Sequence, residues 1–177
     1  IALHNEEEFL PTSNFDIWRN RTVEERWSEI TTQWLTTSRV AGLVGKSERG
    51  YIAPLGPEID RSSFAHIKKL TLTLAAQIAP TAIDLPSLAE RVRWERPRKA
   101  LGSHHDFVHW IAREAAWLGI TGRHALTSFG GALLKGEASL GLQELLPEEI
   151  DFTLIQADNT AIAPGPLQLE LAREMSL

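Results

Sequence analysis

Three histidines, His104, His105 and His109, come nearest to a metal-binding pattern in this chain. A helix would place His105 and His109 on one face, four residues apart, as the imidazoles of zinc sites are often spaced. The zinc-protease motif H-E-x-x-H is not met, because Asp106 stands where the motif requires its general-base glutamate. No third ligand can be assigned beside them, and the chain has no cysteine. We therefore predict no metal and interpret these histidines as exposed helix residues.

The segment Gly42–Ser47 is the closest approach to a phosphate-binding loop. A P-loop reads G-x-x-x-x-G-K-[ST], so that successive backbone N–H groups curl around phosphates between a strand and a helix. Val40 stands where the first glycine is needed, and Glu48–Gly50 follows in place of an apolar helix. We predict no nucleotide binding here and no other cofactor.

Asp151 and Asp158 are the pair of carboxylates that we considered for acid–base catalysis. No substrate-positioning or phosphate-cradling element accompanies them, and Asp158 lies in the turn-forming sequence Ala157–Asn159. The chain also lacks a recognisable nucleophile constellation. The sequence therefore predicts a protein that is not an enzyme.

Lys and Arg residues gather in the middle of the chain, although the whole carries a net charge of −5. Residues 91–135 contain 8 Lys and Arg against 3 Asp and Glu, a net charge of +5, between two acidic flanks. Such a basic block attracts phosphates, although a solvated helix face is the commoner explanation of scattered charge. The nucleic-acid-binding residues that we predict are Arg91, Arg93, Arg96, Arg98, Lys99, His105, His109, Arg113 and Arg123.

The first element that the sequence predicts is a helix beginning at Thr22. The pattern Thr22–Glu25 is a capping box, in which a hydroxyl and a carboxylate satisfy free N–H groups of the first turn. Trp27 and Trp34 belong to an apolar stripe at helical spacing, so we predict that both are core residues. The run Ala53–Pro57 is a loop and a predicted subdomain boundary.

Three further helices are expected between residues 62 and 118. The first starts near Ser62 and ends at Pro80, and the second starts at Asp84 with a proline in its first turn. The third shows His105, His109 and Arg113 at four-residue spacing on its outer side. Ile120–Thr121 and Ala125–Leu126, joined through Gly122–Arg123, form a short hairpin after it. Three helices and a hairpin in this order indicate a winged helix, whose third helix and wing face DNA.

The remaining segment is predicted to continue with short elements. Thr127 caps a helix that Gly136 ends, and Phe152–Ile155 and Thr160–Ala163 are β-prone runs on either side of a turn. Of the 177 residues, 43% are hydrophobic, without an apolar run long enough for a membrane span and without an N-terminal leader, so we expect a cytoplasmic protein. Because the chain starts at Ile1 and stops within an apparent helix, we interpret it as a piece of a longer protein.

Two stretches carry a family resemblance. Leu118–Leu134 (LGITGRHALTSFGGALL) and Ile155–Leu167 (IQADNTAIAPGPL) resemble the bacterial helicase-associated family with an XPB-type helicase N-terminal domain, as do Trp34–Gly45 and Trp94–Arg98. This resemblance covers most of the chain and carries no catalytic signature. It implies an N-terminal helical subdomain at 1–57, a winged-helix-like domain at 58–146 and the truncated start of the XPB-type domain at 147–177.

These observations lead to a mainly α fold with small β hairpins and to a non-catalytic accessory module of a DNA-transaction protein. Its basic winged-helix surface would bind nucleic acid, and a helicase motor or another protein is a further expected partner. No membrane and no small-molecule substrate are expected. The alternative is a protein-interaction or regulatory module that does not touch nucleic acid.

Overall fold

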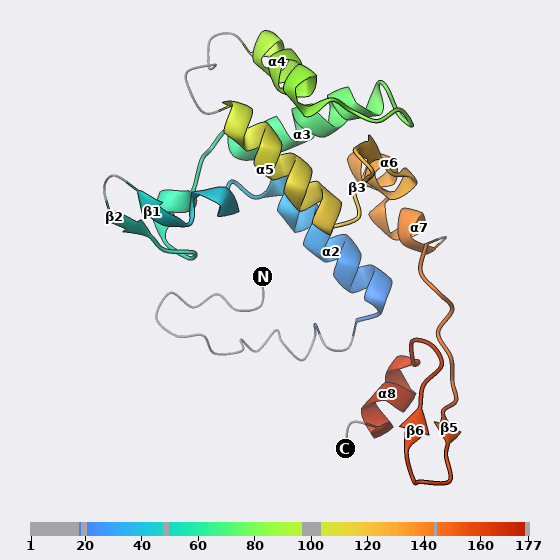
Figure 1. The fold of residues 1–177 in the computed structure, drawn as a ribbon. Helices are drawn as coiled ribbons and strands as arrows, with labels where there is room; N and C mark the ends of the chain where they lie inside the picture. Colours follow the sequence, from blue (N-terminus) through green and yellow to red (C-terminus); the bar gives the residue numbers. More distant parts are fainter. Residues whose placement is uncertain (1–17, 19–20, 48–49, 97–103, 144, 176–177) are drawn as a thin grey trace. The chain divides into compact units, whose positions relative to one another are not determined.

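A computed structural model describes residues 18, 21–47, 50–96, 104–143 and 145–175. The described chain is mainly helical with small antiparallel strand pairs, as the sequence predicts (Figure 1). The helices are α2 (Val23–Thr36), α3 (Phe64–Ala76), α4 (Leu85–Glu95), α5 (His104–Trp117), α6 (Ser128–Lys135), α7 (Ala138–Gln143) and α8 (Leu169–Met175), with 3-10 turns η1 (Ala41–Leu43) and η2 (Pro57–Ile59). The strands are β1 (Gly45–Ser47), β2 (Gly50–Ile52), β3 (Thr121–Gly122), β4 (Ala125–Leu126), β5 (Leu154–Ile155) and β6 (Ala161–Ile162).

The chain divides into two compact units, one of Trp27–Gly141 and one that combines Ile1–Arg26 with Leu142–Leu177. The subdomain boundary that we predicted at residue 57 lies inside the first unit. Side chains from α3 and α5 bind α2 there: Glu114 accepts a hydrogen bond from the Trp34 indole, and the Lys68 ammonium donates to the Trp34 carbonyl. Helix α2 is therefore tied to the helices that follow the predicted boundary.

The capping box at the start of α2 is confirmed. The Thr22 amide donates to Glu25 Oε2 over 3.0 Å, and the Glu25 amide donates to Thr22 Oγ1 over 3.3 Å. The apolar stripe behind it is less buried than we predicted. Trp27 and Trp34 are both half-buried, and Thr31 is the residue of α2 that is fully buried. Trp34 is one of the partly buried residues that pack against the core cluster, whereas Trp27 does not belong to that group, so the prediction of two core tryptophans is confirmed for Trp34 alone.

Helices α3, α4 and α5 pack against one another and form the core of the larger unit. The predicted start of α4 is confirmed, because Asp84 accepts the Ser87 amide at 2.9 Å and Pro86 lies in the first turn. Helix α3 begins at Phe64, two residues after the predicted Ser62, and ends at Ala76, before the predicted end at Pro80. Phe64 and Phe107 meet edge to face, with ring centroids 5.4 Å apart. The fully buried residues of this core include Val40, Phe64, Ile67, Val92, Val108 and Ile111.

A two-residue hairpin, β3–β4, follows α5 and leads into α6. Thr121 pairs with Leu126 and Gly122 with Ala125, so the turn is Arg123–His124 and lies one residue later than predicted. Ile120, which we had placed in the strand, is fully buried before it. Thr127 caps α6 by accepting the Gly130 amide at 3.0 Å, and Gly136 ends it in the left-handed conformation, both as predicted.

The second strand pair predicted from the sequence, β5–β6, lies in the C-terminal segment. Leu154 pairs with Ile162, and the turn between the strands contains Asn159 with φ 62°. Asp158 accepts hydrogen bonds from the Thr160 amide and hydroxyl at 3.0 and 2.7 Å. These hydrogen bonds lower the pKa of Asp158, the side-chain bond contributing most. The carboxylate is thus held ionised in a turn, as expected of a structural residue.

Candidate nucleic-acid interface

The tip of the β3–β4 hairpin holds two bulky residues in an unusual backbone conformation. Arg123 has φ 49° and His124 has φ 64°, the left-handed region that most side chains avoid. The type I′ turn of two-residue hairpins has this geometry at both turn positions, and Asn-Gly is the sequence that adopts it at least cost. The tip is also anchored, because the Ile83 amide donates to the His124 carbonyl over 2.7 Å. Arg123 and His124 therefore occupy fixed positions at the expense of backbone strain.

Helix α5 presents His109 and Arg113 one turn apart on its exposed side. The Arg113 guanidinium lies 5.2 Å from the centroid of the Trp117 ring, and Trp117 is 71% exposed. An arginine stacked on an exposed tryptophan offers both a phosphate-binding fork and a flat apolar ring to a ligand. The C-terminal half of α5 consequently carries cationic and aromatic groups together.

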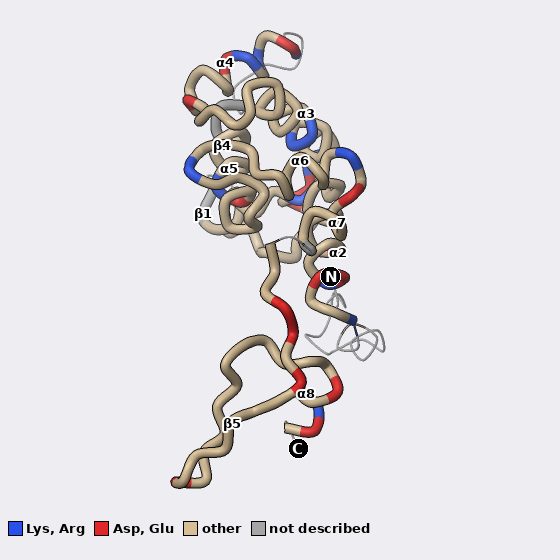
Figure 2. The backbone as a smooth tube through the Cα atoms, turned by 90° about the vertical axis from the view of Figure 1, so that its right-hand side faces the viewer, with Lys and Arg blue, Asp and Glu red and all other residues tan. Residues whose placement is uncertain are grey.

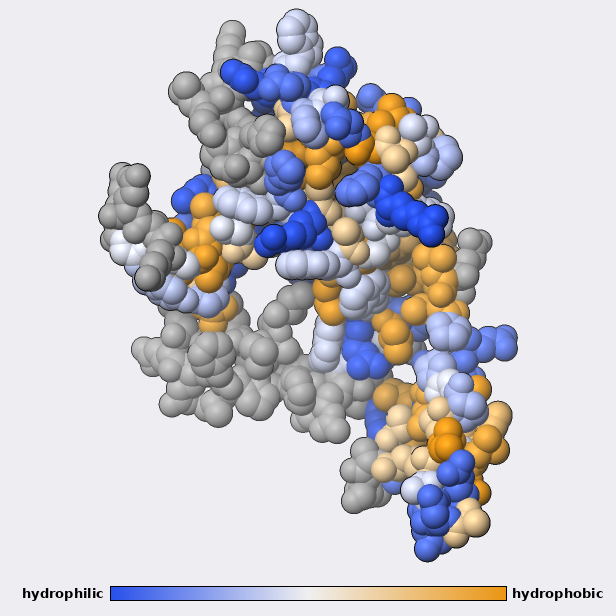
Figure 3. Space-filling model, in the orientation of Figure 1, coloured by the Kyte–Doolittle hydropathy of each residue, from blue (hydrophilic) through white to orange (hydrophobic). Residues whose placement is uncertain are grey.

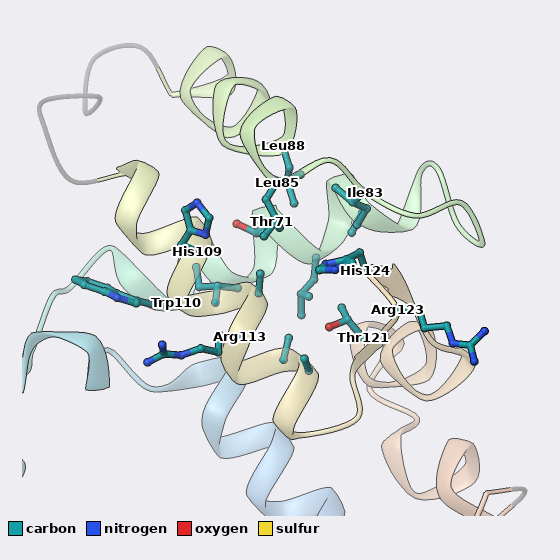
Figure 4. Close-up of a pocket in the computed structure, with 16 residues that line it drawn as sticks. Thr71, Ile83, Leu85, Leu88, His109, Trp110, Arg113, Thr121, Arg123 and His124 are labelled. Atoms are coloured by element: carbon teal, nitrogen blue, oxygen red, sulfur yellow. The ribbon is translucent and has the colours of Figure 1, made fainter.

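The hairpin and α5 share one cavity of about 600 Å³ (Figure 4). His109 and Arg113 reach its edge from α5, and Arg123 and His124 reach it from the hairpin. Figure 4 shows the His124 ring directed toward the middle and the two guanidinium groups extending away from it on opposite sides. Among the described residues that line the cavity, every ionisable side chain is basic. The side chains that line this edge therefore suit an anion better than a cation.

Trp110 forms another wall of the cavity and fixes the position of η1 behind it. A Cβ atom added to Gly42 would lie 2.2 Å from the Trp110 ring, so glycine is required for this close approach. The residues after Gly42 form the β1–β2 hairpin, in which Gly45 pairs with Ile52 and Lys46 with Tyr51. The segment Gly42–Ser47, whose sequence comes closest to a P-loop, thus forms a turn and a strand. A phosphate-binding loop would be followed by a helix, whereas this segment leads into strand β2.

The predicted binding residues of α4 lie beside acidic side chains, unlike those that line the cavity. Arg91 forms an ion pair with Glu95 at 2.8 Å, and Arg93 lies 3.8 Å from Glu90. Along this helix the two arginines lie between the two glutamates, and Figure 2 shows acidic and basic positions close together at α4. Exposed pairs of this kind are weak, but they reduce the net positive charge that α4 offers to a phosphate. Arg96 follows the helix, and its Nη1 atom is buried without an acceptor among the described residues.

The structure therefore brings together three of the predicted binding residues, His109, Arg113 and Arg123, around one cavity. Arg91, Arg93 and Arg96 lie on or beside α4 and do not line it. Arg98, Lys99 and the side chain of His105 fall outside the described residues.

Sequence reasoning missed three candidate binding residues: His124, Trp117 and Trp94. Trp94 is 76% exposed on α4, between Arg93 and Glu95. Both tryptophans could have been found from the sequence, because each lies outside the apolar spacing of its own helix and within one helical turn of an arginine, Arg93 for Trp94 and Arg113 for Trp117. His124 could have been found from the two-residue length of the hairpin, which places it at the tip.

Searches of the described residues for other sites gave two results. They contain no group of three or more His, Asp or Glu side chains arranged to hold a metal ion. Within the same residues, no helix is long and apolar enough to cross a membrane. Comparison of the chain with family models, with curated proteins and with solved structures returned no match.

Proposed function

We propose that the chain is a nucleic-acid-binding module and that it binds through the outer side of α5 and the tip of the β3–β4 hairpin. The observation that carries this proposal is the position of Arg123 and His124, held in strained backbone geometry beside His109 and Arg113. Strained backbone conformations are concentrated at functional sites, where the side chains serve a function that a relaxed turn would not provide. Phosphate binding is the task that suits two guanidinium and two imidazole groups placed around one cavity.

The order of elements supports the same proposal. Helices α3, α4 and α5 pack together, and a hairpin follows α5 directly and packs against it. A winged helix has this order, with its third helix in the major groove and its wing beside the backbone. In that arrangement His109 and Arg113 would face base edges or phosphates, and Arg123 would contact the backbone at the wing.

The exposed tryptophans suggest that unpaired bases of the nucleic acid also contribute to binding, by stacking on these rings. Trp117, with Arg113 stacked on it, and Trp94, with Arg93 next to it, each offer an open aromatic face. Base–aromatic stacking contributes about 1–3 kcal/mol per base and does not depend on sequence. We therefore propose that forked or single-stranded DNA binds at least as tightly as a duplex.

Within this proposal the chain is a non-catalytic, cytoplasmic accessory module of a helicase-associated protein. The family resemblance suggests the winged-helix character of the middle and an XPB-type domain starting near residue 147. Phosphates would be repelled by the acidic flanks of the chain. We expect the isolated chain to bind in the range of about 10⁻⁴ to 10⁻⁶ M, as non-specific DNA binding does at physiological salt.

Fluorescence anisotropy tests the proposal with labelled duplex, forked and single-stranded DNA at two salt concentrations. The variant Arg113→Glu with Arg123→Glu should weaken binding about tenfold or more, because two attractive charges become repulsive. Lys69→Glu with Lys135→Glu is the matched control, since both lysines are exposed, do not line the cavity and change the net charge equally. Equal losses in the two variants would mean that net charge alone governs binding and would contradict this site.

A second candidate function, protein interaction, is favoured by the C-terminal segment. Phe152, Leu154, Ile155 and Ile162 of the β5–β6 region are 44–81% exposed, and Figure 3 shows apolar atoms gathered over this segment. A two-stranded hairpin with exposed apolar side chains and open edges is a surface that other chains can cover. Absence of DNA binding in the anisotropy experiment would favour this alternative.

A further inference from the structure

The cavity beside α5 is larger and more apolar than phosphate contacts require. It extends inward from the basic edge to Leu72 of α3, Leu88 of α4 and Ile111 of α5, three buried core residues. The volume of about 600 Å³ lies in the range of pockets that hold small molecules. We propose that this cavity binds a small molecule with an apolar body and one carboxylate group. The proposal does not depend on nucleic-acid binding.

Small side chains create the hollow. Four alanines line it, Ala75 on α3 and Ala112, Ala115 and Ala116 on α5. An alanine side chain occupies less space than a leucine would from the same backbone position, so these four positions leave part of the space between α3, α5 and the hairpin unfilled. An unfilled apolar space costs stability in proportion to its volume, and an apolar occupant recovers part of that cost. The apolar body of the ligand would lie here.

Charge complementarity determines the polar end of the ligand. The described residues at the edge include His109, Arg113, Arg123 and His124, and none that lines the cavity is acidic. The His124 ring is directed into the cavity, and two threonines, Thr71 and Thr121, add hydroxyl groups to its wall (Figure 4). The Thr71 hydroxyl already donates to the Ile67 carbonyl at 2.7 Å, so it has no proton left to donate to the ligand and could only accept a hydrogen bond from it. Donors therefore predominate, which suits a carboxylate and disfavours an amine.

The size and the surrounding walls of the hollow favour a small molecule over a protein segment. The lining comes from α3, the start of α4, α5 and the β3–β4 hairpin, which surround the cavity from several sides. A peptide groove is open at two ends and is lined along its length, whereas this hollow is surrounded by four elements and, of the basic side chains that line it, only the His124 ring is directed into it. A monocarboxylate with a chain of about eight carbons is a suitable first probe.

A series of three probes separates the apolar and charged contributions. Octanoate, octanol and octylamine have the same apolar chain, and their binding is followed by NMR chemical-shift changes and by the fluorescence of Trp110 in the cavity wall. We expect octanoate to bind more tightly than octanol, and octylamine to bind least. The double variant Arg113→Gln with His124→Gln should remove the preference for octanoate over octanol and leave octanol binding unchanged.

A blocking variant tests the location. Ala116 is exposed at the cavity edge, so Ala116→Phe should fill the hollow without disturbing the core and should reduce octanoate affinity about tenfold or more. Ala76→Phe on the exposed side of α3 is the control and should bind octanoate as the wild type does. Chemical-shift changes outside the cavity, equal affinity for the three probes, or full octanoate binding by Ala116→Phe would each overturn the proposal. Loss of DNA binding with retained octanoate binding would leave it intact.

Discussion

Trp34 and Glu114, 80 positions apart in the sequence, are joined by a 2.7 Å hydrogen bond from the indole Nε1 to a carboxylate oxygen. The Lys68 ammonium donates to the Trp34 carbonyl oxygen and lies 5.1 Å from the Trp34 ring and 4.8 Å from the Phe64 ring. The positive charge of Lys68 thus lies among two aromatic rings, a carbonyl and the nearby Glu114 carboxylate. This polar cluster joins α2, α3 and α5, and it explains how α2 from Trp27 onward belongs to the same unit as the core.

Replacing Trp34 by phenylalanine should lower the stability of the larger unit. The substitution retains an aromatic ring but removes the donor to Glu114, and a hydrogen bond to a charged group contributes about 1.5–3 kcal/mol. Because this bond is only partly buried, we expect a loss near 1.5 kcal/mol in chemical denaturation. Trp117→Phe, at a helix position that is 71% exposed, should change stability by less than about 0.5 kcal/mol. A loss of stability for Trp34→Phe as small as that for Trp117→Phe would contradict a stabilising hydrogen bond between Trp34 and Glu114.

The buried amine of Lys68 should make stability rise with pH on the alkaline side. Burial lowers the pKa of Lys68 from 10.5 to about 8, and the nearby Glu114 carboxylate opposes part of that shift. Between pH 8 and pH 10.5 the folded state has released this proton while the unfolded state keeps it, so unfolding takes up a proton and becomes less favourable as the pH increases. Below pH 8 both states hold the proton, and this contribution does not change.

The variant Lys68→Met isolates this effect. Its stability relative to wild type should be highest at pH 7, and the advantage should shrink between pH 8 and pH 10.5, by up to about 3 kcal/mol. Urea denaturation at several pH values measures the difference. A difference that stays constant across this range would mean that Lys68 titrates normally.

Two neighbouring glycines of α6 should respond in opposite directions to the same substitution. A Cβ atom at Gly130 would lie 2.3 Å from the Ile120 carbonyl oxygen, whereas at Gly131 nothing lies within 4 Å. Gly131→Ala should therefore stabilise the helix by up to about 1 kcal/mol, as alanine does relative to glycine in helices. Gly130→Ala should destabilise the protein by about 2 kcal/mol or more, because backbone must move. Thermal melts of the two variants compare the positions directly.

Relaxing the hairpin tip should increase stability and decrease DNA binding at once. Asn-Gly adopts the left-handed turn at less cost than Arg123–His124, so Arg123→Asn with His124→Gly should raise the melting temperature. The same change removes two basic groups from the proposed interface and should weaken DNA binding severalfold. A melting temperature below that of the wild type would contradict the assigned strain.

The elements that local signals specify were predictable from the sequence. The Thr22–Glu25 capping box, the Asp84 cap with Pro86 and the Gly136 helix end each depend on residues a few positions apart. Helix starts and stops of this kind need no knowledge of the tertiary structure.

Contacts between distant segments were not predictable. The hydrogen bond from Trp34 to Glu114 and the burial of Lys68 depend on how α2 meets α5, and periodicity alone suggested two buried tryptophans. The pairing of Arg91 with Glu95 and of Arg93 with Glu90 is local, in contrast, and its spacing of four and three residues could have been recognised in the sequence.

The salt dependence of DNA affinity tests the central claim most directly. The logarithm of the binding constant falls with the logarithm of salt concentration by about 0.9 for each phosphate contacted. For Arg113→Gln with Arg123→Gln, anisotropy over a salt series should give a slope about two units shallower than that of the wild type. Lys69→Gln with Lys135→Gln should retain the wild-type slope. Equal slopes for wild type and the Arg113/Arg123 variant would contradict a nucleic-acid interface built on α5 and the β3–β4 hairpin.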